Sequence, residues 1–243
     1  MNNARRLVAI VPAWNESGAI GGVVDEIKQF DPSIDVVVID DCSRDDTAHV
    51  AESRGATVLR LPFNVGIGGA VQTGIRYARD EGYEIAVRLD GDGQHAASEL
   101  PKILAPVEAG DADLVIGSRF VEAGGAYRPP LARRIGIGVF ARLVSILGGQ
   151  RVTDTTSGFV ALDRAGIELF ATQFPHDYPE VEATLVALRS GLRVKQVQVD
   201  MRERVAGASS ITFVRSLYYI VKVMLALLVA SLRRYPRLER ASR

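Results

Sequence analysis

Aliphatic and β-branched runs alternate with segments of helical period through the first 90 residues, and this alternation limits the fold more than any other feature. The expected strands are residues 7–11, 35–40, 56–61 and 84–90, separated by helices that end near residues 30, 51 and 79. Such a βαβαβαβ order predicts an α/β fold with a mostly parallel sheet flanked by helices. Ligands of such sheets bind beyond the carboxyl ends of the strands.

Size and charge narrow the class of protein further. A chain of 243 residues that is 47% hydrophobic can bury one well-formed core. Its formal net charge of +0 gives no global field toward a polyanion, so we expect no nucleic acid partner. The single cysteine, Cys42, cannot form an internal disulfide, which favours an intracellular protein in a reducing compartment.

Two aspartates follow the fourth expected strand. Asp90 and Asp92 are two positions apart, so an extended backbone points both carboxylates to one side. Gly91 and Gly93 let the main chain approach a ligand closely. Hard oxygen donors of this kind indicate a Mg²⁺ or Mn²⁺ site that the substrate completes, with Gln94 or His95 as a further ligand. Taken alone, the motif is equally consistent with a polar turn.

Asp40 and Asp41 end the second expected strand and could accept hydrogen bonds from a nucleobase or a ribose. The alternative is that Asp41 or Ser43 caps the helix that follows. The later segment GIGGAVQTG is not a dinucleotide fingerprint, because Val71 stands where the third glycine belongs. We interpret these glycines as sites of close helix packing.

Four segments in register resemble family 2 glycosyltransferases of the GT-A fold, and among them the dolichol-phosphate mannose and other polyprenyl-phosphate sugar synthases. PAWNE resembles the PxxNE opening, VVVIDDCSRDDT the second acidic block, LDGDGQH the DxDxQH metal motif, and DTTSGF the D-x-x-SGF segment. The match runs from about Val8 to Ser210. Trp14 and Gly91 replace the family's commoner Tyr and Ala, and the lysine of the late basic loop is missing.

The resemblance implies a role for each matching residue. The residues expected to hold the donor nucleotide are Pro12, Trp14, Glu16, Ile39, Asp41, Asp90, Gly91, Arg202 and Arg204. Asp90, Asp92 and Gln94 are expected to hold the metal, and Arg119, Arg133 and Arg134 the acceptor phosphate. The catalytic set is then Asp92, Arg119, Arg133 and Arg202.

The expected reaction is an inverting, metal-dependent transfer of a hexose or N-acetylhexosamine from a GDP- or UDP-linked donor to a polyprenyl phosphate. A phosphomonoester is already anionic near neutral pH and needs no general base. A saccharide hydroxyl acceptor is the alternative, with Asp177, Glu180 or Glu182 as the base, unless these acids only favour a helix N-terminus. A non-catalytic sugar-nucleotide sensor and a nucleotidyltransferase are the remaining alternatives.

The C-terminal segment differs in composition from the rest of the chain. From Met201 onward there are 9 Lys and Arg residues but only 2 acids. We therefore expect a catalytic domain over residues 1–210 and an amphipathic helical segment over residues 211–243. An apolar helix followed by arginines is typical of a peripheral protein at the cytoplasmic membrane face. Packing on the domain itself or on a small membrane protein partner is the alternative.

Overall fold

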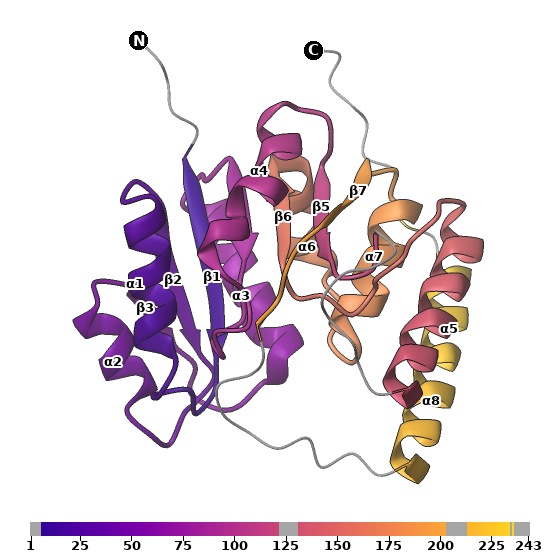
Figure 1. Cartoon of the computed structure of the whole chain (residues 1–243), viewed down its shortest axis with the longest axis horizontal. Coiled ribbons are helices and arrows are strands. Elements are labelled where there is room, and N and C mark those ends of the chain that lie inside the picture. The colour runs from indigo at the N-terminus through magenta and orange to yellow at the C-terminus, as the bar shows by residue number, and fades with distance from the viewer. Residues whose placement is uncertain (1–5, 122–130, 203–212, 234, 236–243) are drawn as a thin grey trace.

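The computed structural model describes residues 6–121, 131–202, 213–233 and 235, with the backbone alone at 131–135 and 213–221. Seven strands and eight α-helices alternate along this part of the chain (Figure 1). The strands are β1 Leu7–Ala13, β2 Asp35–Asp40, β3 Thr57–Arg60, β4 Ile85–Arg88, β5 Leu114–Ser118, β6 Val160–Asp163 and β7 Val194–Gln198. The helices are α1 Ile20–Phe30, α2 Thr47–Ser53, α3 Gly66–Asp80, α4 Leu100–Glu108, α5 Leu131–Gly148, α6 Arg164–Gln173, α7 Pro179–Arg189 and α8 Phe213–Leu232.

The strands form one sheet in the order β3-β2-β1-β4-β6-β5-β7. All neighbouring pairs are parallel except those that β6 makes with β4 and β5. The expectation of a mostly parallel sheet flanked by helices is therefore confirmed. Since β6 runs against β4, its first residue, Val160, pairs with Arg88 at the end of β4. The segment before Val160 is thus brought to the edge where the parallel strands end.

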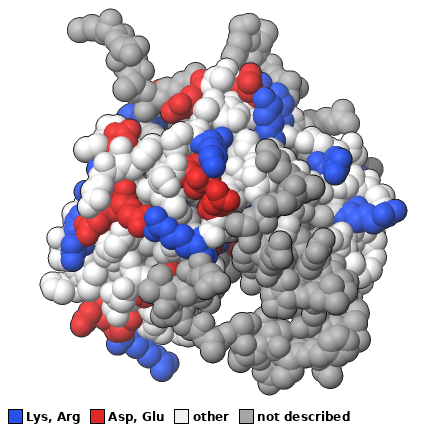
Figure 2. All heavy atoms as spheres, viewed as in Figure 1, with Lys and Arg blue, Asp and Glu red and all other residues white. Residues whose placement is uncertain are grey.

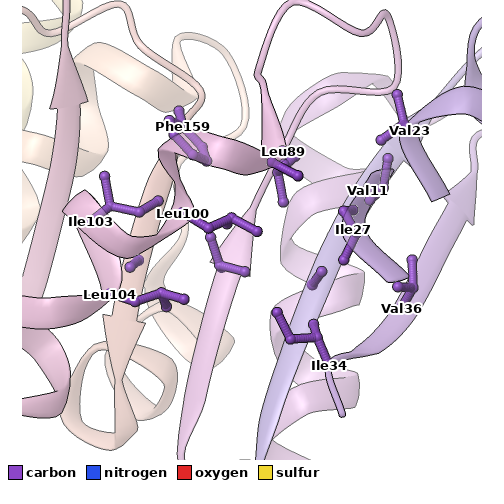
Figure 3. Packing of buried hydrophobic residues seen from close by; sticks show 14 of the residues in the cluster. Val11, Val23, Ile27, Ile34, Val36, Leu89, Leu100, Ile103, Leu104 and Phe159 are labelled. Atoms are coloured by element: carbon purple, nitrogen blue, oxygen red, sulfur yellow. The ribbon is translucent and has the colours of Figure 1, made fainter. Parts of the chain in front are cut away.

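Alternation along each strand divides the core into two layers, because successive side chains point to opposite faces. From β1, Ala9 and Val11 pack with α1 and α4 on one face, where Figure 3 shows Leu100 and Ile103. From the same strand, Val8 and Ile10 pack with α3 and α6 on the other face.

The glycines of α3 pack as closely as the sequence indicates. A Cβ on Gly68 would lie 2.6 Å from the carbonyl oxygen of His176, and one on Gly74 would lie 2.3 Å from Ile10. Both distances are shorter than real Cβ contacts, so only glycine allows α3 to approach the loop before α7 and the sheet this closely. The interpretation of these glycines as packing sites is confirmed for Gly68 and Gly74, whereas a Cβ on Gly66 would meet no atom within 4 Å.

The C-terminal helix α8 lies beside α5, and both helices contact α7 at one end of the molecule (Figure 1). Its inner face packs into a third apolar cluster through Val223, Leu227 and Ala230. Its outer face is apolar but exposed, and consists of Met224, Leu225, Leu228, Val229 and Leu232. Residues 203–212, which join it to the sheet, lie outside the described residues, so the domain boundary at residue 210 stays a prediction.

Within the described part of the chain, no helix has both the length and the hydropathy needed to cross a bilayer. On the face shown in Figure 2, acidic and basic side chains are intermixed over the described surface. The exposed face of α8 gathers large apolar side chains on one helix, which is typical of a surface that contacts a partner or a membrane.

Candidate functional site

The carboxyl ends of β1, β2 and β4 meet at a cleft of about 430 Å³. This is where a ligand is expected in an open α/β sheet. Fourteen residues line the cleft: Pro12, Ala13, Trp14, Glu16, Asp41, Asn64, Gly66, Ile67, Ala70, Arg88, Asp90, Gly91, Asp92 and Glu180. Six residues of the predicted donor site are among them, namely Pro12, Trp14, Glu16, Asp41, Asp90 and Gly91.

The loops after β1 and β2 are tied to each other by side chains. The Asn15 amide N–H donates to Ser43 Oγ at 2.9 Å, and the Arg44 amide N–H donates to Asn15 Oδ1 at 2.8 Å. The Glu16 amide N–H donates to Thr47 Oγ1 at 2.8 Å. Asn15 itself has a positive φ of 54°, a conformation that asparagine tolerates better than most residues. These bonds fix the main chain that carries Trp14 and Glu16 into the cleft.

Asp45 adds further hydrogen bonds between the same loops. It accepts a hydrogen bond from the Ser17 amide at 3.1 Å and others from the amide and hydroxyl of Thr47. Partial burial alone would raise its pKa, but these hydrogen bonds outweigh that effect and lower the pKa of Asp45 to about 2. The carboxylate is therefore ionised throughout the neutral range.

Asp41 binds the start of a helix, although not the helix that the sequence suggested. Its Oδ1 accepts from the Val65 amide at 2.7 Å and its Oδ2 accepts from the Gly66 amide at 2.9 Å. These groups open α3 rather than α2, so the expectation that Asp41 caps the next helix is wrong. A carboxylate that accepts two backbone N–H groups is held rigidly and lies where the positive end of the helix favours it. It still lines the cleft.

The loop after β4 turns through Gly93, whose φ of +76° is a conformation that side chains rarely adopt. Asp92 Oδ1 accepts a hydrogen bond from the Gln94 amide at 3.1 Å, which closes a tight Asx turn. Asp92 is only 7% exposed, and both it and Asp90 line the cleft. The Asp90–Asp92 motif therefore forms a polar turn, and its two carboxylates also line the cleft.

Gly158 makes room for Asp90. A Cβ at Gly158 would lie 2.7 Å from both carboxylate oxygens of Asp90 and 2.9 Å from Arg88 Nη2. The glycine comes from the DTTSGF segment, which the reversed direction of β6 brings beside the end of β4. The requirement for glycine at this position is thus a requirement for space beside an acidic side chain.

His95 supports the loop. Its Nδ1 accepts a hydrogen bond from the Asp90 amide at 3.0 Å, and its ring stacks on Phe159 with 5.0 Å between centroids. Burial lowers the pKa of His95. Because Nδ1 accepts the bond from Asp90 and the residue does not line the cleft, the suggestion that His95 is a metal ligand stays a prediction.

Arg88 and Glu180 were not predicted as a pair. Arg88 Nη2 donates to Asp90 Oδ1 and to Glu180 Oε1, both at 2.9 Å. Arg88 is the last residue of β4 and is only 6% exposed, and Glu180 stands in the first turn of α7. A charged residue inside a strand otherwise composed of buried aliphatic residues was the available signal, since arginine is almost never buried unless it is paired.

Comparison with known proteins identifies the family of this chain. The sequence profile described as Glycosyl transferase family 2 matches residues 8–170. The chain belongs to this family. It is a glycosyltransferase, and the mixed sheet with its flanking helices is the GT-A fold.

Two relatives cover most of the chain. The transferase is 32% identical over 216 residues to a protein of Micrococcus luteus named undecaprenyl-phosphate mannosyltransferase, covering 85% of this chain and 88% of the relative. It is 31% identical over 218 residues to one of Mycolicibacterium smegmatis named polyprenol monophosphomannose synthase, covering 86% and 82% of the two chains.

A solved structure supports the fold. The crystal structure of glucosyl-3-phosphoglycerate synthase from Mycobacterium tuberculosis, in complex with Mn²⁺, UDP and glucosyl-3-phosphoglycerate, superposes with a TM-score of 0.71. It is 22% identical, with 94% of this chain and 80% of that chain covered. At this identity the likeness bears on the fold alone.

The arginines that the sequence predicts as phosphate contacts differ in how far the structure describes them. Arg119 follows β5, is 6% exposed, and donates from Nε and Nη2 to the buried carboxylate of Asp154 at 2.9 and 3.1 Å. A further bond joins its Nη2 to Thr156 Oγ1 at 2.7 Å. Arg119 is not among the described residues that line the cleft, so its role toward an acceptor phosphate stays a prediction.

The remaining predicted arginines are placed only in part. The Arg202 amide donates to the Gln94 carbonyl at 2.9 Å, which brings the late basic segment to the Asp92 loop. The Arg202 side chain itself pairs with Glu26 of α1 at 2.5 Å. The backbone of Arg133 and Arg134 lies in the first turn of α5, their side chains are not described, and Arg204 falls outside the described residues.

Ile39 lies near the end of β2, and its side chain is fully buried among the apolar residues between the sheet and α3. It does not line the cleft, so its part in holding the donor nucleotide stays a prediction.

The acidic residues of the cleft suit a divalent cation. Asp90 and Asp92 line the same cleft on either side of Gly91, whose position a Cβ would crowd against the Pro12 carbonyl oxygen at 3.1 Å. Mg²⁺ and Mn²⁺ are typically held by one or two carboxylates together with substrate phosphates, which is the donor set that this loop offers. Among the described residues, no three His, Cys, Asp or Glu side chains form a metal-binding group on their own.

Proposed function

We propose that this glycosyltransferase transfers a hexose or N-acetylhexosamine, with inversion, from a GDP- or UDP-linked donor to a polyprenyl phosphate. The observation that carries the acceptor class is the match to two relatives whose names specify undecaprenyl-phosphate and polyprenol monophosphate chemistry. Each match extends over more than four fifths of both chains.

The cleft has the groups that such a donor needs. Trp14 is 54% exposed at the mouth and offers a flat apolar surface to a base. Asp90 and Asp92 would hold Mg²⁺ or Mn²⁺, which supplies positive charge where the departing diphosphate becomes negative. Glu16 and Asp41 line the same wall and can accept hydrogen bonds from hydroxyl groups of the nucleoside.

A phosphate acceptor simplifies what the protein must do. Its second pKa is near 6, so its oxygen is already a nucleophile at neutral pH, and direct attack on the anomeric carbon inverts the configuration. The protein then has only to align the two reactants and to stabilise the leaving group. Arg202 and Arg204 from the late basic segment, with Arg119, Arg133 and Arg134, are the proposed phosphate contacts.

The outer face of α8 supports a peripheral site at the membrane. Leu225 is 62% exposed and Leu228 is 47% exposed, both on a helix whose inner face is already packed. A helix of this kind can insert its apolar side chains into the headgroup region while the rest of the protein remains in water. The chain beyond α8 is rich in arginine, which favours the anionic cytoplasmic leaflet.

A hydroxyl acceptor remains the second candidate, because Glu180 lines the cleft and could serve as a base. Against it stands the ion pair with Arg88, whose Nη2 lies 2.9 Å from Glu180 Oε1 and occupies one oxygen of the carboxylate. Glu182 is half-buried, and burial together with the charge of Asp177 raises its pKa, but it does not line the cleft.

The test is a transfer assay with two matched lipids. Purified enzyme is mixed with Mn²⁺ and labelled GDP-mannose, UDP-glucose or UDP-N-acetylglucosamine, in vesicles that contain either polyprenyl phosphate or the corresponding polyprenol. We expect a mild-acid-labile glycolipid with the phosphate and none with the alcohol. No product with any donor contradicts the proposed acceptor, and equal transfer to both lipids indicates the hydroxyl mechanism.

A further inference from the structure

Arg88 places a permanent positive charge in direct contact with a proposed metal-binding carboxylate. Its Nη2 lies 2.9 Å from Asp90 Oδ1, and its Nε is buried without a hydrogen-bond partner among the described residues. A guanidinium at this distance fixes the carboxylate, but it also offsets the negative charge that a divalent cation needs. Arg88 alone would therefore hold Asp90 in place and weaken its affinity for metal.

Glu180 lies where it can compensate for this effect. Its Oε1 is 2.9 Å from the same Nη2 atom, on the side of Arg88 contributed by α7. One cation is thus shared between two carboxylates, and Asp90 does not have to offset it alone.

The surroundings keep Arg88 in this position. It is 6% exposed, and the small cavity behind it, of about 40 Å³, is lined mainly by apolar residues such as Ile116 and Val160. Glu180 also lines this cavity, and because a buried guanidinium without counter-charges is strongly destabilising, we expect Arg88 to stay between Asp90 and Glu180. Gly158 closes the other side, where any Cβ would collide with both Arg88 and Asp90.

We propose that Glu180 is a positioning residue that acts through Arg88: it offsets the charge of Arg88, so that Asp90 stays anchored and keeps its affinity for a divalent cation. The inference rests on the proposed metal-dependent function. Arg88 and Glu180 are 92 positions apart, and the sequence motifs do not connect them. The inference assigns this pair a role in preparing the cleft for a metal ion.

The test measures binding of Mn²⁺ alone, followed by the electron paramagnetic resonance of the free ion. Glu180→Gln removes one charge and keeps the shape, and we expect it to lower Mn²⁺ affinity about tenfold, because Asp90 then has to offset the charge of Arg88 alone. The double variant Arg88→Met/Glu180→Gln removes both opposite charges, and with them the Arg88 anchor of Asp90, and we expect it to bind Mn²⁺ more tightly than Glu180→Gln because the uncompensated charge is gone.

Glu182→Gln is the matched control, because Glu182 shares the first turn of α7 but does not line the cleft. It should leave Mn²⁺ affinity unchanged, and melting temperatures should show that all variants are folded. Wild-type affinity in Glu180→Gln, or a double variant no better than the single one, overturns the inference and leaves the proposed function intact. A wild-type protein that binds no Mn²⁺, either alone or with GDP or UDP present, contradicts both.

Discussion

The edge of the sheet at β1, β2 and β4 and the helical layer of α5, α7 and α8 present opposite kinds of surface. At the sheet edge, polar side chains are fixed by many hydrogen bonds, as with Asp41 on the start of α3. In the helical layer, the inner apolar side chains are packed and the outer ones, such as Leu225, are exposed. The sheet edge suits a charged ligand that must be held in one position. The exposed face of the helical layer suits an apolar surface that needs no fixed position.

A large effect is expected from crowding the ordered sheet edge without removing any of its functional side chains. Gly158→Ala places a methyl group 2.7 Å from both carboxylate oxygens of Asp90, so that side chain must shift. We expect transferase activity to fall about a hundredfold, because small displacements of reacting groups have effects of that size. Steady-state rates with saturating donor measure this, and Gly138→Ala on α5, where a Cβ meets no atom within 4 Å, is the control. Equal activity of both variants would show that the edge tolerates displacement.

The next largest effect is expected on membrane binding by the exposed apolar face of α8. Leu225→Glu/Leu228→Glu places two charges on the outer face of α8, and we expect vesicle binding to weaken about tenfold or more, because each buried leucine contributes roughly 1.5–3 kcal/mol. Cosedimentation with vesicles of anionic lipid measures it. Phe30→Glu, at an exposed apolar residue of α1, is the control and should bind like the wild type. If the α8 variant also binds like the wild type, this face does not contact the bilayer.

A smaller effect is expected at the start of α3. Asp41→Asn leaves only one acceptor oxygen for the two amides of Val65 and Gly66. The loss of one such bond to a helix N-terminus costs about 1 kcal/mol of unfolding free energy. Urea unfolding measures that cost. A variant as stable as the wild type would mean that water or another group replaces the carboxylate.

The smallest expected effect is on stability, from removing the hydrogen bonds that Asp45 makes between the loops after β1 and β2. Asp45→Asn should cost a few tenths of a kcal/mol, since the group is near the surface and solvent screens it. Because folding lowers the pKa of Asp45 from 3.8 to about 2, its contribution is complete above pH 4 and is lost as the pH falls toward 2. Unfolding curves between pH 2 and pH 6 should show a wild-type advantage that disappears at the acid end.

The sequence predicts the sheet edge better than the rest. Periodicity and strand-terminal acids locate the cleft, because a parallel sheet brings the ends of β1, β2 and β4 together whatever the details of packing. The reversal of β6 has no such local signal, and with it the contact of Gly158 with Asp90 could not be derived from spacing.

Pairing over long distances is equally hidden. Nothing near Arg88 indicates that its second partner is Glu180 on α7, since that contact depends on how α7 packs against the sheet. Asp41 shows the same limit at short range, because a strand-terminal acid can cap either of two helices and only the tertiary structure chooses α3. The surroundings of Ile39 are equally hidden from the motif, because both faces of β2 are covered by apolar clusters and its side chain is buried in one of them.

The most direct test of the account replaces Asp92, the carboxylate that closes the turn after β4 and lines the cleft. In Asp92→Ala, we expect turnover to fall about a thousandfold and Mn²⁺ to bind at least tenfold more weakly, with the fold intact. Full turnover together with unchanged Mn²⁺ affinity in this variant would contradict the assignment of the cleft as a metal-dependent sugar transfer site.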